Sequence, residues 1–207
     1  MKDRPGIVFL LDDEPGMLKA LERLLRAEGF DVRPFARARD FLEAYRPGED
    51  GCLVLDVSMP ELDGMELQRQ LAQAGISLPV VFLTGRGDIP MSVRAMKAGA
   101  VDFLTKPVND SDLLRAVRAA LREADERRAA IAEAAVLGAR FQRLTPRERE
   151  VMGGVVAGKL NKQIAADLGT GEQNIKVHRG RVMRKMGVSS VADLVRAAQK
   201  LATAREC

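Results

Sequence analysis

Short apolar runs alternate with amphipathic stretches through the first half of the chain, and this alternation constrains the fold more than any other feature. The runs are rich in aliphatic and aromatic residues and too short for helices, as expected of strands buried on both faces. They are residues 7–11, 30–35, 52–55, 79–83 and 101–104. The stretches between them repeat apolar residues at helical spacing. Strands and helices that alternate through short links predict an α/β fold, a doubly wound parallel sheet covered on both faces.

Polar side chains follow four of these runs at the point where each predicted strand ends: Asp12 and Asp13, Asp56, Thr84 and Lys106. The carboxyl ends of parallel strands meet at one edge, where ligands gather. Three carboxylates in one crevice repel one another and need a cation, and oxygen ligands favour Mg²⁺. A carboxylate beside such an ion can attack a phosphoryl group, to which Thr84 and Lys106 could offer a hydroxyl and an ammonium. Each residue alone has an ordinary explanation as a cap, loop or solvated residue, so the argument depends on their coincidence.

The ordered set of motifs resembles the receiver domain of two-component response regulators, over roughly residues 5–122. The matching pieces are Leu11–Glu14, Leu55–Pro60 with Asp63–Gly64, Leu83–Gly85, Ala98–Leu104 and Lys106–Pro107. The resemblance implies a flavodoxin-like (βα)5 domain with a cis peptide before Pro107.

The same resemblance implies a role for each residue of the acidic pocket. Asp56 would accept the phosphoryl group, and Asp12, Asp13, Asp56 and the backbone carbonyl of Ser58 would bind Mg²⁺. Thr84 and Lys106 would bind the phosphoryl oxygens. The aromatic switch residue of the family falls on Phe103, for which a plain core role stays open.

The charge of the chain is unevenly distributed, and the basic excess lies in the last third. Residues 1–122 carry 17 basic and 19 acidic residues, whereas residues 143–207 carry 13 and 6, a net +7. Such an excess favours a polyanionic partner such as DNA, although a solvated basic surface has the same composition. We predict a receiver domain over 1–122, a helical linker over 123–142 and an all-α domain of four helices over 143–207. The linker could extend the last receiver helix or form a weak coiled coil.

Two short helices over 161–168 and 172–186, separated by Gly169–Gly171, fit a helix-turn-helix whose second helix enters the major groove. Ile175, Val182 and Met186 are predicted to face the core. The basic residues on the other faces are expected to point toward solvent or phosphate, and Asn174 can pair with base edges. These basic residues are Lys176, Arg179, Arg181, Arg184 and Lys185.

The last third resembles the LuxR/NarL-type helix-turn-helix, and the whole chain resembles the FixJ subgroup of response regulators. The matching segments are Leu144–Val151, Asn161–Ala165, Val177–Arg179 and Lys185–Met186. By resemblance, Lys176 and Val177 reach bases or the groove floor. The family's usual residues are missing at Gly171, Asn174 and Gly180, which leaves the target sequence open. His178 is interpreted as a structural or DNA-backbone residue.

These patterns predict a transcription factor that is switched when a sensor histidine kinase phosphorylates Asp56. Its expected partners are promoter DNA, RNA polymerase and, on phosphorylation, a second copy in a homodimer. We expect no catalytic residue, and no enzymatic activity other than slow autodephosphorylation. Neither a signal peptide nor a membrane-spanning run is apparent, and the two cysteines cannot form a disulfide framework, so a cytoplasmic location is expected. Two alternatives remain: a Mg²⁺-dependent phosphohydrolase with Asp56 as nucleophile, and a DNA-binding protein whose receiver works without phosphorylation.

Overall fold

The computed structural model describes residues 6–85 and 89–206, which divide into two compact units, 1–128 and 129–207. The first unit alternates strands and helices in the predicted order. Its elements are β1 (Ile7–Leu11), α1 (Pro15–Ala27), β2 (Asp31–Phe35), α2 (Ala38–Ala44), β3 (Gly51–Asp56), α3 (Gly64–Gln73), β4 (Val80–Thr84), α4 (Ile89–Lys97), β5 (Asp102–Thr105) and the start of α5 (Asp110–Gln142). Strands β2, β4 and β5 each begin one residue later than the sequence predicted.

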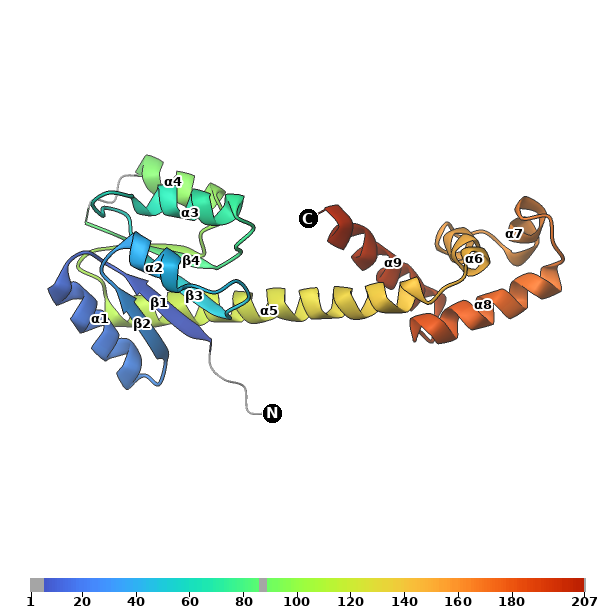
Figure 1. Ribbon diagram of the computed structural model, residues 1–207, viewed down its shortest axis with the longest axis horizontal. Helices are drawn as coiled ribbons and strands as arrows, with labels where there is room; N and C mark the ends of the chain where they lie inside the picture. Colours follow the sequence, from blue (N-terminus) through green and yellow to red (C-terminus); the bar gives the residue numbers. More distant parts are fainter. Residues whose placement is uncertain (1–5, 86–88, 207) are drawn as a thin grey trace. The chain divides into compact units, whose positions relative to one another are not determined.

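The five strands form one parallel sheet in the order β2-β1-β3-β4-β5, which confirms the predicted fold class. Helices cover both of its faces (Figure 1). Successive side chains of a strand point to opposite faces, so Phe9 and Leu11 pack with α2, α3 and α4. Val8 and Leu10 pack on the other face with α1 and the first part of α5. This two-sided burial explains why the strands are continuous apolar runs.

Helix α5 begins at Asp110, passes through Gly138 without a break and ends at Gln142. The expected linker is therefore helical and continuous with the last receiver helix. Leu113 and Val117 belong to the core of the first unit, while Leu137 and Phe141 pack in the core of the second. No helix among the described residues is long and apolar enough to span a membrane.

The second unit contains the end of α5 and four further helices: α6 (Pro146–Val156), α7 (Asn161–Asp167), α8 (Glu172–Met186) and α9 (Val191–Glu206). Helix α6 begins with a capping box, in which Thr145 and Glu148 bond to each other's backbone amides. Helix α9 begins at Val191, because Ser190 and Asp193 exchange the same kind of backbone bonds. That pair stops the helix from extending further back.

Candidate functional site

The carboxyl ends of the strands bring the predicted polar residues to one edge of the sheet. In the strand register, Leu11 is level with Leu55, and Asp56 is level with Leu83. Asp12 follows β1 directly and Asp56 is the last residue of the neighbouring β3. Thr84 ends β4 beside Thr105 of β5, so Lys106 starts from the same edge. The parallel topology thus brings to one edge the residues for which the sequence predicted a common site.

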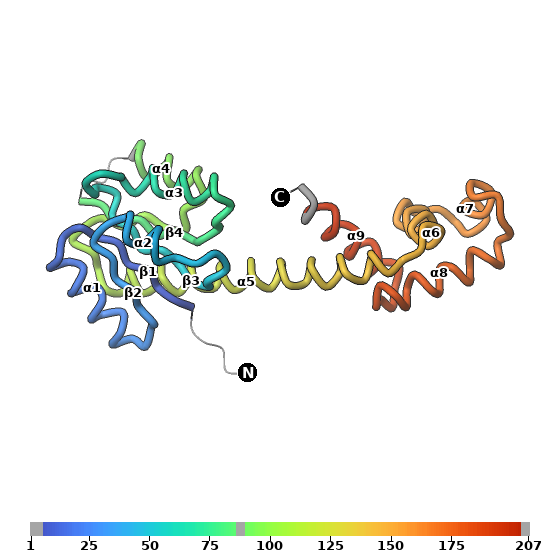
Figure 2. The backbone as a smooth tube through the Cα atoms, viewed as in Figure 1, coloured from blue at the N-terminus to red at the C-terminus, as the bar shows by residue number. Residues whose placement is uncertain are grey.

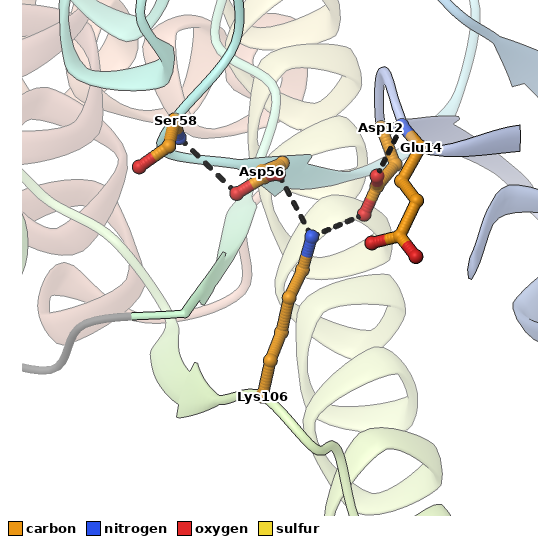
Figure 3. Close-up of polar contacts among 5 residues, drawn as sticks. All are labelled: Asp12, Glu14, Asp56, Ser58 and Lys106. Carbon is orange, nitrogen blue, oxygen red and sulfur yellow. Dashed lines mark hydrogen bonds and ion pairs between the residues drawn. The ribbon is translucent and has the colours of Figure 1, made fainter. Parts of the chain in front are cut away.

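Lys106 reaches from the segment after β5 to a position between two buried carboxylates (Figure 3). Its Nζ donates to Asp12 Oδ2 at 2.7 Å and to Asp56 Oδ2 at 2.8 Å. The other oxygens accept from backbone amides, Asp12 Oδ1 from Glu14 at 2.9 Å and Asp56 Oδ1 from Ser58 at 3.1 Å. Asp12 is 0% and Asp56 4% exposed. Both carboxylates are therefore oriented by hydrogen bonds from two sides.

The electrostatics of this cluster favour a bound cation. Burial raises the pKa of Asp12, against the opposing effect of its hydrogen bond from Lys106. Burial disfavours the charged form of Lys106, but its bonds to Asp12 and Asp56 outweigh that effect and raise its pKa. One ammonium thus faces two buried carboxylates, so the cluster as a whole still favours additional positive charge.

Asp13 adds a third carboxylate on the exposed side of the cluster. One carboxylate oxygen from each of Asp12, Asp13 and Asp56 lies within 4.8 Å of the others. Oxygen-only ligands at the mouth of a partly buried crevice suit a hard divalent ion that keeps several waters, such as Mg²⁺. The donor set therefore fits the predicted metal.

Gly64 allows the chain to pass directly beside the backbone of Asp56. A Cβ at position 64 would lie 2.5 Å from the carbonyl oxygen of Asp56, and the Gly64 amide donates to Val57 O at 2.9 Å. Asp63 caps α3 at this point by accepting from the amide of Glu66. The sequence indicated Gly64 only as part of a motif. Its structural requirement depends on the close approach of two segments.

Thr84 and Phe103 lie where the family pattern places a phosphoryl-binding and a switch residue. Thr84 is 1% exposed, and its carbonyl accepts the Lys106 amide at 2.7 Å. Phe103 is partly buried, with its ring centroid 6.2 Å from that of Phe82. Since the Phe103 ring contacts the core without being enclosed, the geometry is compatible with both roles that the sequence left open.

In the second unit, α7, a short turn and α8 form the predicted helix-turn-helix (Figure 2). Ile175, Val182 and Met186 are 0% exposed, which confirms the predicted inner face of α8. The residues on the outer faces of α8 are exposed, among them Asn174, Lys176, Val177, Arg181 and Arg184. Arg181 and Arg184 form no ion pair with any residue in the described part of the chain.

Two of the basic residues expected to face solvent or phosphate are instead held within the domain. Arg179 donates to Asn161 Oδ1 at 2.9 Å. Lys185 Nζ donates to Glu148 Oε2 at 2.7 Å and to Arg143 O at 3.1 Å. Glu148 is only 2% exposed, and the Lys185 ammonium lowers the pKa of its carboxyl. The expectation that the charge of Lys185 points outward therefore needs correction.

Arg140, near the end of α5, contacts the end of α8 and was missed by sequence reasoning. Its Nη1 donates to the carbonyl of Met186 at 3.0 Å. Gly187 ends α8 with φ 66°, and a Cβ there would lie 2.7 Å from the same nitrogen. A cation is favourable at the C-terminus of a helix. The only sequence signal was a basic residue in the last turn of α5, which does not identify its partner.

Comparisons with known proteins agree with both halves of this structure. Residues 8–118 match the response regulator receiver domain, and residues 142–198 match bacterial regulatory proteins of the luxR family. The chain is 45% identical to the response regulator protein TodT of Pseudomonas putida, covering 97% of this chain and 88% of that protein. It is 41% identical to the transcriptional regulatory protein FixJ of Bradyrhizobium diazoefficiens, over 94% and 95% of the two chains.

Solved structures show the same relationship. Response regulator StyR superposes with a TM-score of 0.79 at 45% identity, covering 95% of this chain and 99% of that chain. Full-length FixJ from B. japonicum gives 0.57 at 41% identity, covering 96% and 98%.

The chain belongs to the two-component response regulators that carry a receiver domain and a LuxR-type DNA-binding domain. Within that family it is FixJ-like. It is a transcription regulator controlled by phosphorylation rather than a classical enzyme. This architecture implies a sensor kinase and promoter DNA as partners.

Proposed function

We propose that Asp56 is the phosphoryl acceptor and that its phosphorylation controls DNA binding by α8. The observation that carries the first part is the position of Lys106 Nζ between the Asp12 and Asp56 carboxylates. It places a fixed positive charge where the oxygens of a phosphoryl group on Asp56 would lie. Such preorganised charge is the main contribution of a protein to phosphoryl transfer.

In the proposed reaction, an Asp56 carboxylate oxygen attacks the phosphorus of a phosphohistidine on the kinase. The new O–P bond forms as the N–P bond breaks, and the imidazole leaves with the bonding electron pair. Lys106 and the amide of Ser58, which already contact the carboxylate, would then bind the phosphoryl oxygens, together with the Thr84 hydroxyl. The product is an acyl phosphate, which water hydrolyses slowly.

Mg²⁺ would be held by Asp12, Asp13, Asp56 and the backbone carbonyl of Ser58. When bound, the ion offsets negative charge on the transferring oxygens. The fit rests on the cluster of three carboxylates and on the raised pKa of Asp12, both of which favour a cation. Asp13 is the exposed carboxylate of the three, so it would bind the ion on the side that faces solvent.

Phosphorylation adds negative charge at the sheet edge, beside the side chains that would respond. We infer that Thr84 moves toward the phosphoryl group and that Phe103 shifts with β5, which changes the surface formed by α4, β5 and α5. A local charge change that biases a two-state element is sufficient for such a switch. We further propose that the phosphorylated protein dimerises through this surface and contacts RNA polymerase. Its proposed location is the cytoplasm, where promoter DNA lies.

For DNA binding, we propose that α8 enters the major groove. Its outer face carries Lys176, Val177, Arg181 and Arg184, with Asn174 near its start. Arg179 and Lys185 would act mainly by holding α8 in the domain through Asn161 and Glu148. We propose to divide the chain into a receiver domain over 1–122, a linker over 123–142 and a DNA-binding domain over 143–207.

The test of the acceptor is phosphorylation by acetyl phosphate and Mg²⁺, followed by peptide mass spectrometry. We expect one acyl phosphate at Asp56 in the full chain and none in Asp56→Asn. Asp63→Asn is a matched control, because an amide oxygen can still cap α3. Phosphorylation at another residue, or at none, would refute the assignment.

Two further assays on the wild-type protein and Asp56→Asn test the alternatives, a phosphohydrolase and a receiver that works without phosphorylation. A phosphohydrolase would release phosphate from a small phosphomonoester over many turnovers, whereas we expect none beyond the single acyl phosphate. Ser58 stands where such enzymes usually have a second acid. A phosphorylation-independent receiver would leave Asp56→Asn with unchanged oligomeric state and promoter affinity in the presence of acetyl phosphate.

A further inference from the structure

A glycine lies in the middle of the exposed face of α8. Gly180 is exposed, nine residues into a helix that runs from Glu172 to Met186. Glycine inside a helix is destabilising relative to alanine, since it loses more backbone freedom on folding. The helix that carries the basic outer face thus contains its least favourable ordinary residue at an exposed central position.

Nothing in residues 6–85 and 89–206 requires glycine at this position. Gly180 is absent from the glycines with positive φ, so its backbone suits any residue. A Cβ built on it meets no heavy atom within 4 Å. The contrast with Gly187 is direct, because that residue has φ 66° and a Cβ there would press on Arg140. The described chain therefore leaves room for a side chain that position 180 does not carry.

The neighbours of Gly180 on the helix surface indicate what lies outside. Residues three and four apart share a face, so Gly180 lies beside Val177 and Arg184 on the side opposite the core. Val177 is 46% exposed, so its apolar side chain is available for contact on this face. Helical geometry places Lys176 on one flank of this stripe and Arg181 on the other. Val177 and Gly180 therefore form a stretch of short side chains on this outer face, with Arg184 one turn further along and Lys176 and Arg181 on the flanks.

We propose that Gly180 is the point where the α8 backbone approaches DNA most closely. The inference rests on the proposed insertion of α8 into the major groove. Without a side chain at 180, the helix can sit deep enough for Val177 to touch base edges, where an apolar group fits the thymine methyl. The flanking cations then reach phosphates on either side. Gly180 therefore determines the depth of insertion, and through it the specificity.

The test adds side chains at Gly180 and at a matched glycine in the same domain. Gly153, inside α6, is also exposed, has no positive φ and has open space around it. The full-length variants are Gly180→Ala and Gly180→Gln, with Gly153→Ala and Gly153→Gln as controls. The probes are the duplex that the wild-type protein selects from a random-sequence library and a duplex of unrelated sequence. Binding is measured by fluorescence anisotropy with Mg²⁺ and beryllofluoride, and unfolding by thermal denaturation.

We expect all four substitutions to raise the melting temperature of the second unit, the alanines by about 4 °C. Only the Gly180 variants should bind the selected duplex more weakly, with Gly180→Gln losing about tenfold, the factor typical of one lost base contact. Their affinity for the unrelated duplex should not change, because no charge is altered.

Wild-type affinity for the selected duplex in both Gly180 variants would overturn the proposal, as would a lowered melting temperature, which would indicate a packing role. If the wild-type protein selected no duplex at all, the proposed DNA-binding helix would fail instead. Loss of binding in Arg184→Ala but not in Gly180→Gln would leave that helix in place and remove only the close approach.

Discussion

The ion pair between Lys185 and Glu148 gives a sharp test of how the DNA-binding unit is held together. Replacing Lys185 with Met removes the charged amino group and keeps an unbranched apolar side chain one atom shorter. The Glu148 carboxylate, 2% exposed, would then lose its charged partner and keep its bond from the Thr145 amide at 2.8 Å. Lys185 also ties the carbonyl of Arg143 to α8 at 3.1 Å. Both contacts are lost together.

The expected loss follows from these contacts. A hydrogen bond to a charged group contributes about 1.5–3 kcal/mol. The side chain of Lys185 is 31% exposed, so solvent screens the pair and the lower part of that range applies. We therefore expect Lys185→Met to lower the free energy of unfolding of the second unit by about 1.5–2 kcal/mol at neutral pH.

The pH dependence has a defined sign. The pKa of Glu148 is lowered in the folded state, first by the Lys185 bond and then, against the effect of burial, by Thr145. Its stabilisation is present above the ordinary carboxyl pKa of 4.5 and is lost as the pH falls through the lower folded value. The difference between wild type and Lys185→Met should therefore shrink in that acidic window.

The assay is a double-mutant cycle with Glu148→Gln, whose amide oxygen can still accept from Thr145. Hydrogen exchange of α6 and α8 peptides in the full chain reports the stability of this unit. A coupling energy near zero would refute the reasoning. So would an unchanged stability of Lys185→Met combined with a smaller salt dependence of DNA binding, since that result would assign Lys185 to phosphate.

Three further results are expected. Gly64→Ala would place a Cβ 2.5 Å from the carbonyl oxygen of Asp56, so it should destabilise the receiver by about 1–3 kcal/mol and slow its phosphorylation. Urea unfolding and labelling with acetyl phosphate measure the two effects, and wild-type behaviour in both would contradict the prediction. Cys52 is 0% exposed, and burial raises the pKa of its thiol to about 12, so iodoacetamide at neutral pH should not alkylate it until the protein unfolds. Peptide mapping measures the alkylation, and labelling of Cys52 in the folded protein would contradict the prediction. Arg184→Ala should weaken binding to all duplexes and reduce the slope of log affinity against log salt by about 1, whereas an unchanged slope would exclude a phosphate contact.

The sequence alone determined the class of fold and the members of the acidic pocket. Apolar runs that end in Asp12, Asp56 and Thr84 can satisfy their burial only as central parallel strands. Parallel strands necessarily bring their carboxyl ends to one edge. The inner face of α8 was equally determined, because helical periodicity leaves Ile175 and Met186 on the buried side.

The tertiary structure alone decided which partner each polar group has. Local patterns do not encode contacts between residues far apart in the chain. The pairing of Lys185 with Glu148, the bond from Arg140 to the end of α8 and the approach of Gly64 to Asp56 all depend on how packed elements meet. Periodicity could place Lys185 on the outer side of a helix, but only the neighbouring α6 supplied the buried carboxylate that turns it inward. Which residues lie at an edge or on a face follows from the backbone period, whereas which atoms touch there follows from the packing.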